Sequence, residues 1–264
     1  MHRMSPGWAT DVAILELTGS RVIDRGDHLV IRTPDNPDYH WGNCILVTEP
    51  DAVDDAGRWS AVFTAEFPEA SWFAAGLPRM PQDLQAWTDL GVALEQLDVL
   101  TTTTVPATSP LADGYTVREL GGDDWELVAA RDIAENARTG EYDDAAHQRF
   151  IRGKVATRRR LCERGLAAFF GVFAGDELVA DLGIVRCGIL ARFQDVGTDA
   201  AHRRRGLASH LLGVAAAWAA DRDCRTWVIV TESTNAAGRV YRRAGFALDD
   251  AEFNAYRHPG RELP

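Results

Sequence analysis

"TDAAHRRRGLASHLL", residues 198–212, places three consecutive arginines and a glycine directly before an apolar pattern typical of a helix. The first backbone N–H groups of a helix have no partner inside it, and with the helix dipole they attract anions such as phosphate. Gly206 and Ala208 carry little or no side chain, so a ligand can approach the main chain closely. Guanidinium groups that suit a pyrophosphate come from Arg203, Arg204 and Arg205. The stretch therefore predicts a pyrophosphate-binding turn between a strand and a helix.

Other phosphate-binding loops do not fit this sequence. It contains no GxxxxGK[ST], which excludes a P-loop, and no GxGxxG after a first strand, which excludes a dinucleotide-binding fingerprint. The pattern that fits is R-x-x-G-x-A at residues 203–208. Taken alone, this short pattern is also typical of a solvated basic turn, so its meaning depends on the rest of the chain.

Composition limits the function. The chain has 264 residues, 46% of them hydrophobic and 25% charged, which is typical of a globular protein with one large or two ordinary domains. A formal net charge of −11 argues against general nucleic-acid binding, even through the basic runs at residues 157–161 and 202–206. The four cysteines show neither a CxxC pair nor zinc-like spacing, so no metal is expected.

The sequence predicts a cytoplasmic protein. Its first residues lack an apolar run long enough for a signal peptide, and no window approaches the ~20 apolar residues of a membrane span. Isolated cysteines fit a reducing compartment. We therefore expect no membrane partner, and a monomer or a homodimer.

A linker-like stretch, "TTTTVPATSPLADG" at residues 101–114, divides the chain. After it, helical and extended patterns alternate, which predicts an α/β layer fold. In chain order we expect a strand at 115–120, helices at 123–137 and 143–165, a hairpin at 166–186, a strand at 189–198, a helix at 204–222, a strand at 225–232, a short helix at 235–245 and a closing hairpin at 246–258. The predicted domains are residues 1–108 and 109–264.

The N-terminal half repeats the end of this pattern. We expect strands at 28–33 and 44–49, a helix at 57–67, an extended segment at 71–77 and a helix at 81–91. "WTDLGVALEQ", residues 87–96, aligns with "YRRAGFALDD", residues 241–250, with Gly91 opposite Gly245. This favours a degenerate internal duplication. The alternative is that any helix ending at a left-handed glycine before a strand has this appearance.

A second motif decides the interpretation. "NAAGRVYRRAGF", residues 235–246, follows the arginine–glycine loop by about thirty residues. Together the two motifs resemble the GNAT superfamily of acetyl-CoA-dependent N-acetyltransferases, over about residues 115–258. The resemblance implies an α/β fold with a mixed (α+β) sheet, GNAT-like and tandem with a degenerate N-terminal half. Asn235 lies six residues before Tyr241, whereas the family more often has seven, so Thr234 is an alternative for its role.

The resemblance implies a binding site for acetyl-CoA. Main-chain groups of Val196 and Thr198 are expected to pair with the pantetheine arm, and the N–H near Val196 to stabilise the thioester oxygen as charge develops. The remaining cofactor-binding residues that it implies are Arg203, Arg204, Arg205, Gly206, Leu207, Ala208, Ser209 and Asn235. At the corresponding place the N-terminal half reads "DAVDDAGRWS", which is acidic, so we expect no acetyl-CoA there.

The catalytic residues are assigned in the same way. Tyr241 matches the family tyrosine near the sulfur, where a phenol can protonate or hydrogen-bond to the departing thiolate. The alternative is a core tyrosine with its hydroxyl group capped. For the proton acceptor the first candidate is Glu232, with Asp195, Glu177 or an ordered water as alternatives. His202 and His210 flank the loop and are expected to bind or solvate phosphate.

The predicted function is transfer of an acetyl group from acetyl-CoA to a primary amine of a small molecule or peptide, directly within a ternary complex. The acceptor pocket is expected in residues 123–165 and the N-terminal half, where "DYHWGN" at 38–43 is either a substrate contact or a loop closed by its own turns. The alternative function is a non-catalytic acyl-CoA-binding sensor or scaffold with the same fold.

Overall fold

The computed structural model describes residues 4–140 and 142–259, which form two compact units. The first unit contains the described residues of Met1–Val99, Thr231–Asn235 and Leu248–Pro264. The second contains Leu100–Val230 and Ala236–Ala247. The two units group residues by their proximity in space. The domains 1–108 and 109–264 are drawn from the sequence at the linker between the two halves, and they stay a prediction.

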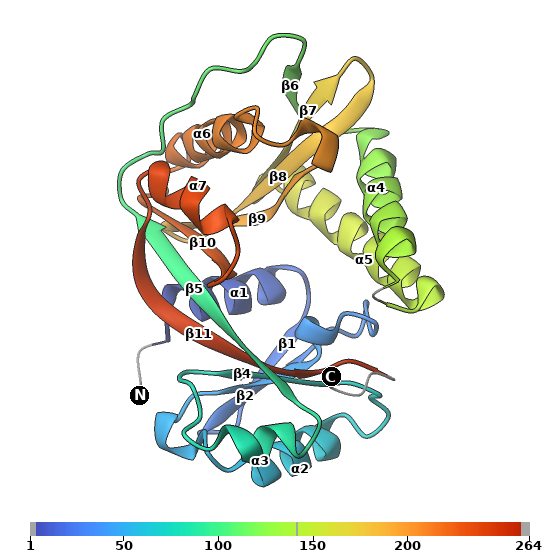
Figure 1. The fold of residues 1–264 in the computed structure, drawn as a ribbon, viewed down its shortest axis with the longest axis vertical. Helices are drawn as coiled ribbons and strands as arrows, with labels where there is room; N and C mark the ends of the chain where they lie inside the picture. The colour runs from blue at the N-terminus through green and yellow to red at the C-terminus, as the bar shows by residue number, and fades with distance from the viewer. Residues whose placement is uncertain (1–3, 141, 260–264) are drawn as a thin grey trace. The chain divides into compact units, whose positions relative to one another are not determined.

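In the sheet, five adjacent strands of the second unit follow the order β10-β9-β8-β7-β6 (Figure 1). These strands are antiparallel except for β9 and β10, which run parallel. The elements follow the prediction closely: β6 (Thr116–Glu119), α4 (Asp124–Thr139), α5 (Asp144–Glu163), β7 (Ala167–Ala174), β8 (Glu177–Cys187), β9 (Leu190–Thr198), α6 (Leu207–Ala220), β10 (Thr226–Glu232) and α7 (Ala237–Arg243).

Helices cover both faces of this part of the sheet. Successive side chains of β7 point to opposite faces, and because both sets are apolar, each face needs a helix layer to cover it. Phe169 meets Trp125 of α4 edge-on at 5.5 Å between ring centroids. The next residue, Phe170, belongs to the core that α6 completes. Leu207 and Leu211 of α6 are buried in this core, and Val214 and Trp218 are partly buried and pack against it. Small residues of the helix complete the core, since Ala215, Ala216 and Ala219 are fully buried.

The predicted linker lies against α6. A Cβ on Gly213 would overlap the main chain of Thr108, and the Nδ1 atom of His210 lies 2.6 Å from the carbonyl oxygen of Ser109. Glycine at 213 is therefore what allows the linker to pass so close to the helix.

In the first unit the strands follow the order β1-β2-β3-β4-β11-β5, with β3 and β4 parallel. Its strands are β1 (Arg21–Asp24), β2 (His28–Arg32), β3 (Cys44–Val47), β4 (Phe73–Leu77), β5 (Ala93–Thr102) and β11 (Ala247–Arg257). Its helices are α1 (Pro6–Leu17), α2 (Ala56–Glu66) and α3 (Leu84–Thr88). The sequence analysis missed α1 and β1.

The predicted closing hairpin at 246–258 is wrong, because these residues form the single strand β11. It pairs with β4 from Phe253 opposite Leu77 to Arg257 opposite Phe73. The segment has no glycine to adopt the positive φ that a tight hairpin turn favours, and Asp249 and Asp250 stay extended and exposed. The aligned glycines Gly91 and Gly245 both have positive φ (69° and 95°) between a helix and a strand.

Candidate functional site

The parallel strands β9 and β10 part along their length. Their pairing runs from Thr226 opposite Leu190 to Val228 opposite Arg192. Strand β9 nevertheless continues to Thr198. Main-chain groups on this edge of β9 beyond Arg192 are therefore outside the β9–β10 ladder and are placed to pair with an extended ligand.

A β-bulge lies in this free part of β9. Opposite β8, Gln194 pairs with Gly183 and Gly197 pairs with Asp181, so β9 has one residue more than β8 between these pairs. Asp195, inside the bulge, has a φ of 51°. Bulges bend a strand and redirect its main-chain groups, and they are frequent beside active sites. The main chain at Val196 is thus released from the regular ladder.

Two cations from α5 hold the bulge. The Nζ atom of Lys154 lies 2.6 Å from Oδ1 of Asp195, and Arg158 forms an ion pair with Oδ2. Desolvation opposes ionisation of Asp195, but the two cations outweigh it and hold the pKa of this carboxyl well below its usual range. Asp195, an alternative proton acceptor in the sequence analysis, therefore resembles an anchor more than a base.

The N-terminus of α6 is open to solvent. Its N-cap residue is Gly206, with a φ of 77°, and a Cβ built there meets nothing within 4 Å. Arg203, Arg204 and Arg205 are exposed beside it. Arg204 also has a positive φ, 62°, so this turn presents its amides in an irregular, nest-like conformation. An uncapped helix end flanked by exposed arginines is suited to bind an anion such as a phosphate.

Aromatic contacts fix the surroundings of this turn. The hydroxyl group of Tyr115 lies 2.9 Å from Nδ1 of His202, and the guanidinium of Arg205 lies 5.9 Å from the Tyr115 ring centroid. Arg203 donates from Nε to the carbonyl oxygen of Thr198, over 3.0 Å. The imidazole of His202 contacts Tyr115 and that of His210 contacts the carbonyl oxygen of Ser109, and their expected contact with phosphate stays a prediction.

Tyr241 lies in α7 with a buried side chain. Burial raises the pKa of Tyr241 to about 12, so the phenol stays protonated at neutral pH and is able to donate. Val196, Thr198, residues 203–209 and Tyr241 all belong to the second unit.

Glu232, the last residue of β10, and Asn235, in the turn after it, are both exposed and are grouped with the first unit. The N–H of Asn235 donates to the carbonyl oxygen of Glu232 over 3.0 Å. Glu177 is exposed at the first residue of β8.

A cavity of about 370 Å³ lies next to the bulge, lined by α4, α5, Asp181 of β8 and the last residues of β9. Its walls include Val196, Gly197, Tyr142, Phe150, Arg131 and Asp181. Several of these residues come from 123–165, and the expectation that this segment and the N-terminal half form the acceptor pocket stays a prediction. Asp181 was missed by the sequence analysis, although an acid inside the apolar run "LVADLGIVR" is itself a signal, since charges are rarely buried without a role.

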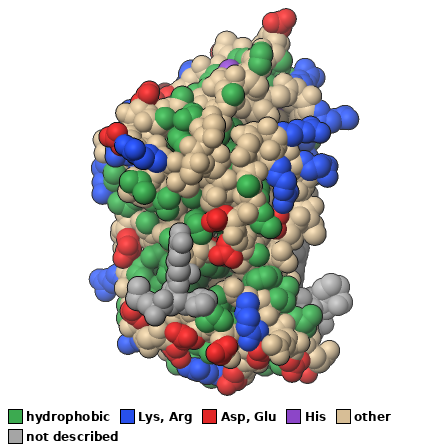
Figure 2. Space-filling model, turned by 90° about the vertical axis from the view of Figure 1, so that its left-hand side faces the viewer, with side chains coloured by type: hydrophobic (Ala, Val, Ile, Leu, Met, Phe, Trp, Pro, Cys, Tyr) green, Lys and Arg blue, Asp and Glu red, His purple; other side chains and the backbone are tan. Residues whose placement is uncertain are grey.

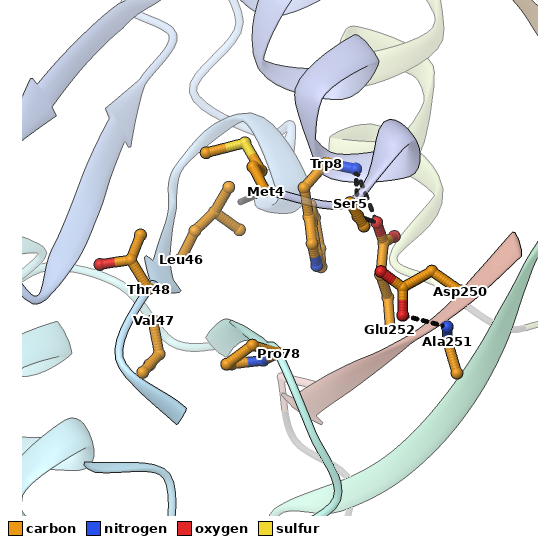
Figure 3. A pocket seen from close by; sticks show the side chains of 10 residues that line it. All are labelled: Met4, Ser5, Trp8, Leu46, Val47, Thr48, Pro78, Asp250, Ala251 and Glu252. Atoms are coloured by element: carbon orange, nitrogen blue, oxygen red, sulfur yellow. Dashed lines mark hydrogen bonds between the residues drawn. The ribbon is translucent and has the colours of Figure 1, made fainter. Parts of the chain in front are cut away.

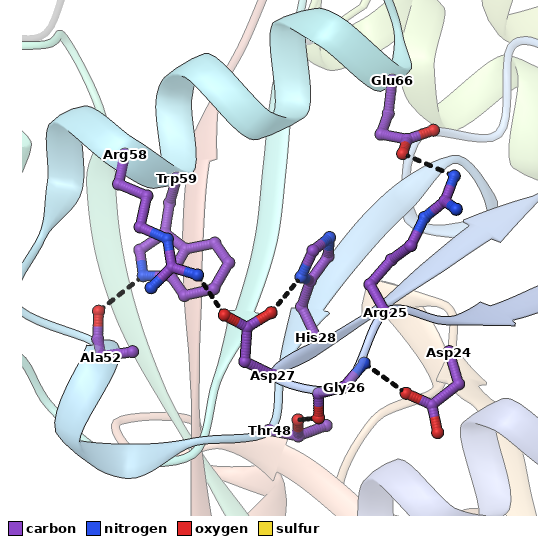
Figure 4. Close-up of polar contacts among 10 residues, drawn as sticks. All are labelled: Asp24, Arg25, Gly26, Asp27, His28, Thr48, Ala52, Arg58, Trp59 and Glu66. Atoms are coloured by element: carbon purple, nitrogen blue, oxygen red, sulfur yellow. Dashed lines mark hydrogen bonds and ion pairs between the residues drawn. The ribbon is translucent and has the colours of Figure 1, made fainter.

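In the first unit, the N-terminus of α2 is capped by the chain itself. The carboxylate of Asp55 accepts from the N–H of Arg58 over 3.0 Å. The Arg58 side chain turns to Asp27, whose other oxygen lies 2.7 Å from Nδ1 of His28 (Figure 4). An anion arriving at this helix end would have to displace Asp55, in contrast to the N-terminus of α6.

The first unit also has a cavity of about 150 Å³, where β3 and β4 end beside the start of α1 (Figure 3). The buried Glu252 carboxylate at its wall accepts from the hydroxyl group of Ser5 and, over 2.6 Å, from the N–H of Trp8. This acid caps α1. The loop at residues 38–43 is closed by its own contacts, since the Asn43 side chain donates to the carbonyl oxygen of Tyr39 over 2.8 Å.

Charges of both signs occur on the surface. On the face in Figure 2, basic side chains gather toward the upper right and acidic ones are frequent at the lower end. Within residues 4–140 and 142–259 no cluster of three or more His, Cys, Asp or Glu has the arrangement of a metal site. No helix among these residues has the length and apolar character to span a membrane.

Comparison with known families identifies the second unit. The model of the acetyltransferase (GNAT) family matches residues 128–246, from α4 to the end of α7. Residues 128–246 are a GNAT acetyltransferase domain. The family and the fold support an acetyl-CoA-dependent N-acetyltransferase in general terms. A search of curated proteins finds no match to the sequence.

Solved structures show that the GNAT fold extends over the chain. A GCN5-related N-acetyltransferase from Kribbella flavida is 16% identical, with a TM-score of 0.67 and 98% of each chain covered. A conserved protein of unknown function from Staphylococcus epidermidis is 12% identical, with a TM-score of 0.69 over 92% of this chain and 95% of the other. A tandem GNAT protein from the clavulanic acid biosynthesis pathway is 14% identical, with a TM-score of 0.54 over 98% and 91%. At these identities the similarity shows the fold alone.

Proposed function

We propose that this protein is an N-acetyltransferase that moves an acetyl group from acetyl-CoA to a primary amine of a small molecule or peptide, by direct attack within a ternary complex. One observation carries the proposal. The part of β9 that leaves the ladder, with its bulge at Val196, leads within a few residues to the uncapped N-terminus of α6. A ligand with an extended amide arm and a pyrophosphate matches this succession of groups.

The proposed cofactor site follows from this geometry. Main-chain groups of Val196 and Thr198 would hold the pantetheine arm, and the amides from Gly206 to Ser209, with the three arginines, would hold the pyrophosphate. Asn235 remains the proposed contact that the family pattern implies. Bound acetyl-CoA would supply a thioester whose carbonyl carbon accepts the amine nitrogen and whose sulfur leaves.

Two side chains are proposed to act on protons. The buried, protonated phenol of Tyr241 donates a hydrogen bond or a proton where negative charge appears on sulfur. From the sequence, Glu232 is the first candidate for the proton acceptor. It is exposed at the end of β10 and raises the pKa of Glu95 by repulsion, after the larger effect of burial.

The alternative function, an acyl-CoA-binding sensor without turnover, shares the cofactor site but needs no acceptor. The test is release of free CoA thiol from acetyl-CoA in the presence of a panel of primary amines. Thiol release that depends on an amine supports the enzyme. Binding of acetyl-CoA without thiol release from any amine supports the sensor, and no binding of acetyl-CoA contradicts both.

A further inference from the structure

A buried acid faces the cavity beside the β9 bulge. The side chain of Asp181 is 4% exposed, and it lines the cavity together with Val196 and Gly197. Its Oδ1 atom forms an ion pair with Nη2 of Arg131 on α4. Its Oδ2 atom accepts no hydrogen bond from any residue that the structure describes. One oxygen of this carboxylate is therefore held while the other stays available to a ligand.

The main chain of β9 is shaped to admit this carboxylate. Asp181 is paired with Gly197, the residue after Val196. A Cβ on Gly197 would lie 2.6 Å from Nη2 of Arg131 and 3.2 Å from Oδ1 of Asp181. A side chain at 197 would thus displace the Arg131–Asp181 pair, and glycine lets the pair lie directly against the bulge. The carboxylate is consequently next to the proposed thioester position.

The charges around Asp181 are mixed. Arg131 from α4 and Arg158 from α5 favour its ionised form, whereas Asp132 from α4 and Asp195 from β9 oppose it. Lys154 of α5 is engaged by Asp195, and Asp199 lies 3.7 Å from Nε of Arg131. Burial dominates and raises the pKa of Asp181 to about 6, in the range that suits a base working near neutral pH.

We propose that Asp181, in place of Glu232, is the proton acceptor for the acceptor amine, and that the cavity beside it takes amines that are protonated at neutral pH. This inference rests on the proposed acetyltransferase function. An alkyl ammonium, with a pKa near ~10, must lose a proton before its nitrogen can attack. One N–H bond of the ammonium breaks, a bond forms between that proton and Oδ2 of Asp181, and the electron pair stays on nitrogen. The proton is later released to solvent.

The rival interpretation is that Asp181 only neutralises Arg131. A structural pair of this kind would keep the fold intact but would leave the pH dependence of turnover unaffected by Asp181. The two interpretations therefore differ in kinetics rather than in stability. Asp132, which also lines the cavity, offers a matched position for the same isosteric change.

The experiment compares wild type, Asp181→Asn and Asp132→Asn with two acceptors: an alkylamine that wild type accepts, and hydroxylamine, which is already neutral at neutral pH. With the alkylamine, wild-type kcat/KM is expected to rise with pH through an apparent pKa near 6. Asp181→Asn is expected to lose about 10²-fold or more in kcat. Hydroxylamine turnover stays close to wild type. Asp132→Asn is expected to move the rise to lower pH, because a carboxylate that repels Asp181 is removed.

Equal losses of Asp181→Asn with both acceptors, or an unchanged kcat, would overturn the assignment. The wild-type pH profile is a second test that needs no variant, and the absence of a rise near pH 6 would also overturn it. If wild type turns over no amine at all, the proposed function fails. The ¹³C carboxyl signal of Asp181 then still tests this residue, because titration at the ordinary aspartate pKa contradicts a burial-raised proton acceptor.

Discussion

Burial raises the pKa of two acids of the site, and the two shifts have different consequences. It raises the pKa of Tyr241 to about 12, which keeps a donor protonated, and that of Asp181 to about 6, which places a proton acceptor near neutrality. Pairs of groups with such separated pKa values are typical of acid–base assignments. A single substitution at each of these two residues tests its role.

Tyr241→Phe removes the phenolic proton and leaves the buried ring in place. We expect kcat to fall by about 10²-fold, because a general acid contributes that much or more, while the affinity for acetyl-CoA stays near wild type. Steady-state thiol release and calorimetric titration with acetyl-CoA measure the two quantities. An unaffected kcat would remove Tyr241 from the mechanism, and a collapse of affinity would make it a binding residue.

Asp181→Asn also has a predicted effect on stability. Because the folded-state pKa of Asp181 lies above that of the unfolded chain, native wild type binds more protons between about pH 4 and pH 6. The free energy of unfolding of wild type should therefore fall relative to that of Asp181→Asn as pH rises through this window. Urea unfolding at several pH values checks this. A relative gain of wild type over the same window would mean that Arg131 dominates the pKa.

At the scale of the element, the β9 bulge and its anchors decide where the Val196 N–H points. Removing the Asp195 carboxylate frees Lys154 and Arg158 and lets the bulge relax. We expect Asp195→Gly, which tolerates the positive φ, to lower kcat/KM for acetyl-CoA about tenfold, well below the 10²–10³-fold cost of losing an oxyanion donor outright.

The control for this change is Asp195→Asn. Asparagine tolerates the left-handed conformation and retains an acceptor oxygen for Lys154 and Arg158, so kcat/KM should lie between wild type and Asp195→Gly. The same steady-state assay with acetyl-CoA as the varied substrate measures it. If the two variants behave alike and like wild type, the anchors do not position the bulge.

Elements were predictable where local signals agree with tertiary contacts. The run of apolar residues in β7 and β8 and the glycine-ended helices gave correct assignments in the second unit. The bulge was not predictable, since it exists only in the register between β8 and β9, several residues away from the Gly188 turn that joins these strands. Strand β11 was mistaken for a hairpin because Asp249 and Asp250 are typical of turns, and pairing with β4 overrides that preference.

The residues of the site divide in the same way, into those that local sequence reveals and those that depend on tertiary contacts. Residues 203–208 carry their chemistry in local sequence, so the loop was predictable. The position of Asp181 depends on its ion pair with Arg131, fifty positions earlier, and on the space left by Gly197 on the next strand. No local sequence pattern reveals these contacts. The one local signal of Asp181 was an acid within an apolar strand.

At the scale of the whole molecule, the chain has two helix N-termini in comparable sequence positions but with opposite electrostatics. The N-terminus of α6 has a glycine cap and exposed arginines, whereas that of α2 is capped by Asp55. We therefore expect one acetyl-CoA site per chain, in the second unit. Asp55→Gly, which removes the capping carboxylate, should leave that stoichiometry unchanged in calorimetry. A second site in this variant or in wild type would contradict the expectation.

The most direct test of the account is calorimetric titration of acetyl-CoA into wild type, Gly206→Glu and Gly206→Gln. Both variants place a side chain of similar size in open space at a positive φ, so they share the backbone strain and differ only in charge. We predict one site per chain in wild type, weakened binding in Gly206→Gln and loss of detectable binding in Gly206→Glu, with both variants folded by circular dichroism. Equal affinities in the two variants, or no binding by wild type, would contradict an acetyl-CoA site at the N-terminus of α6.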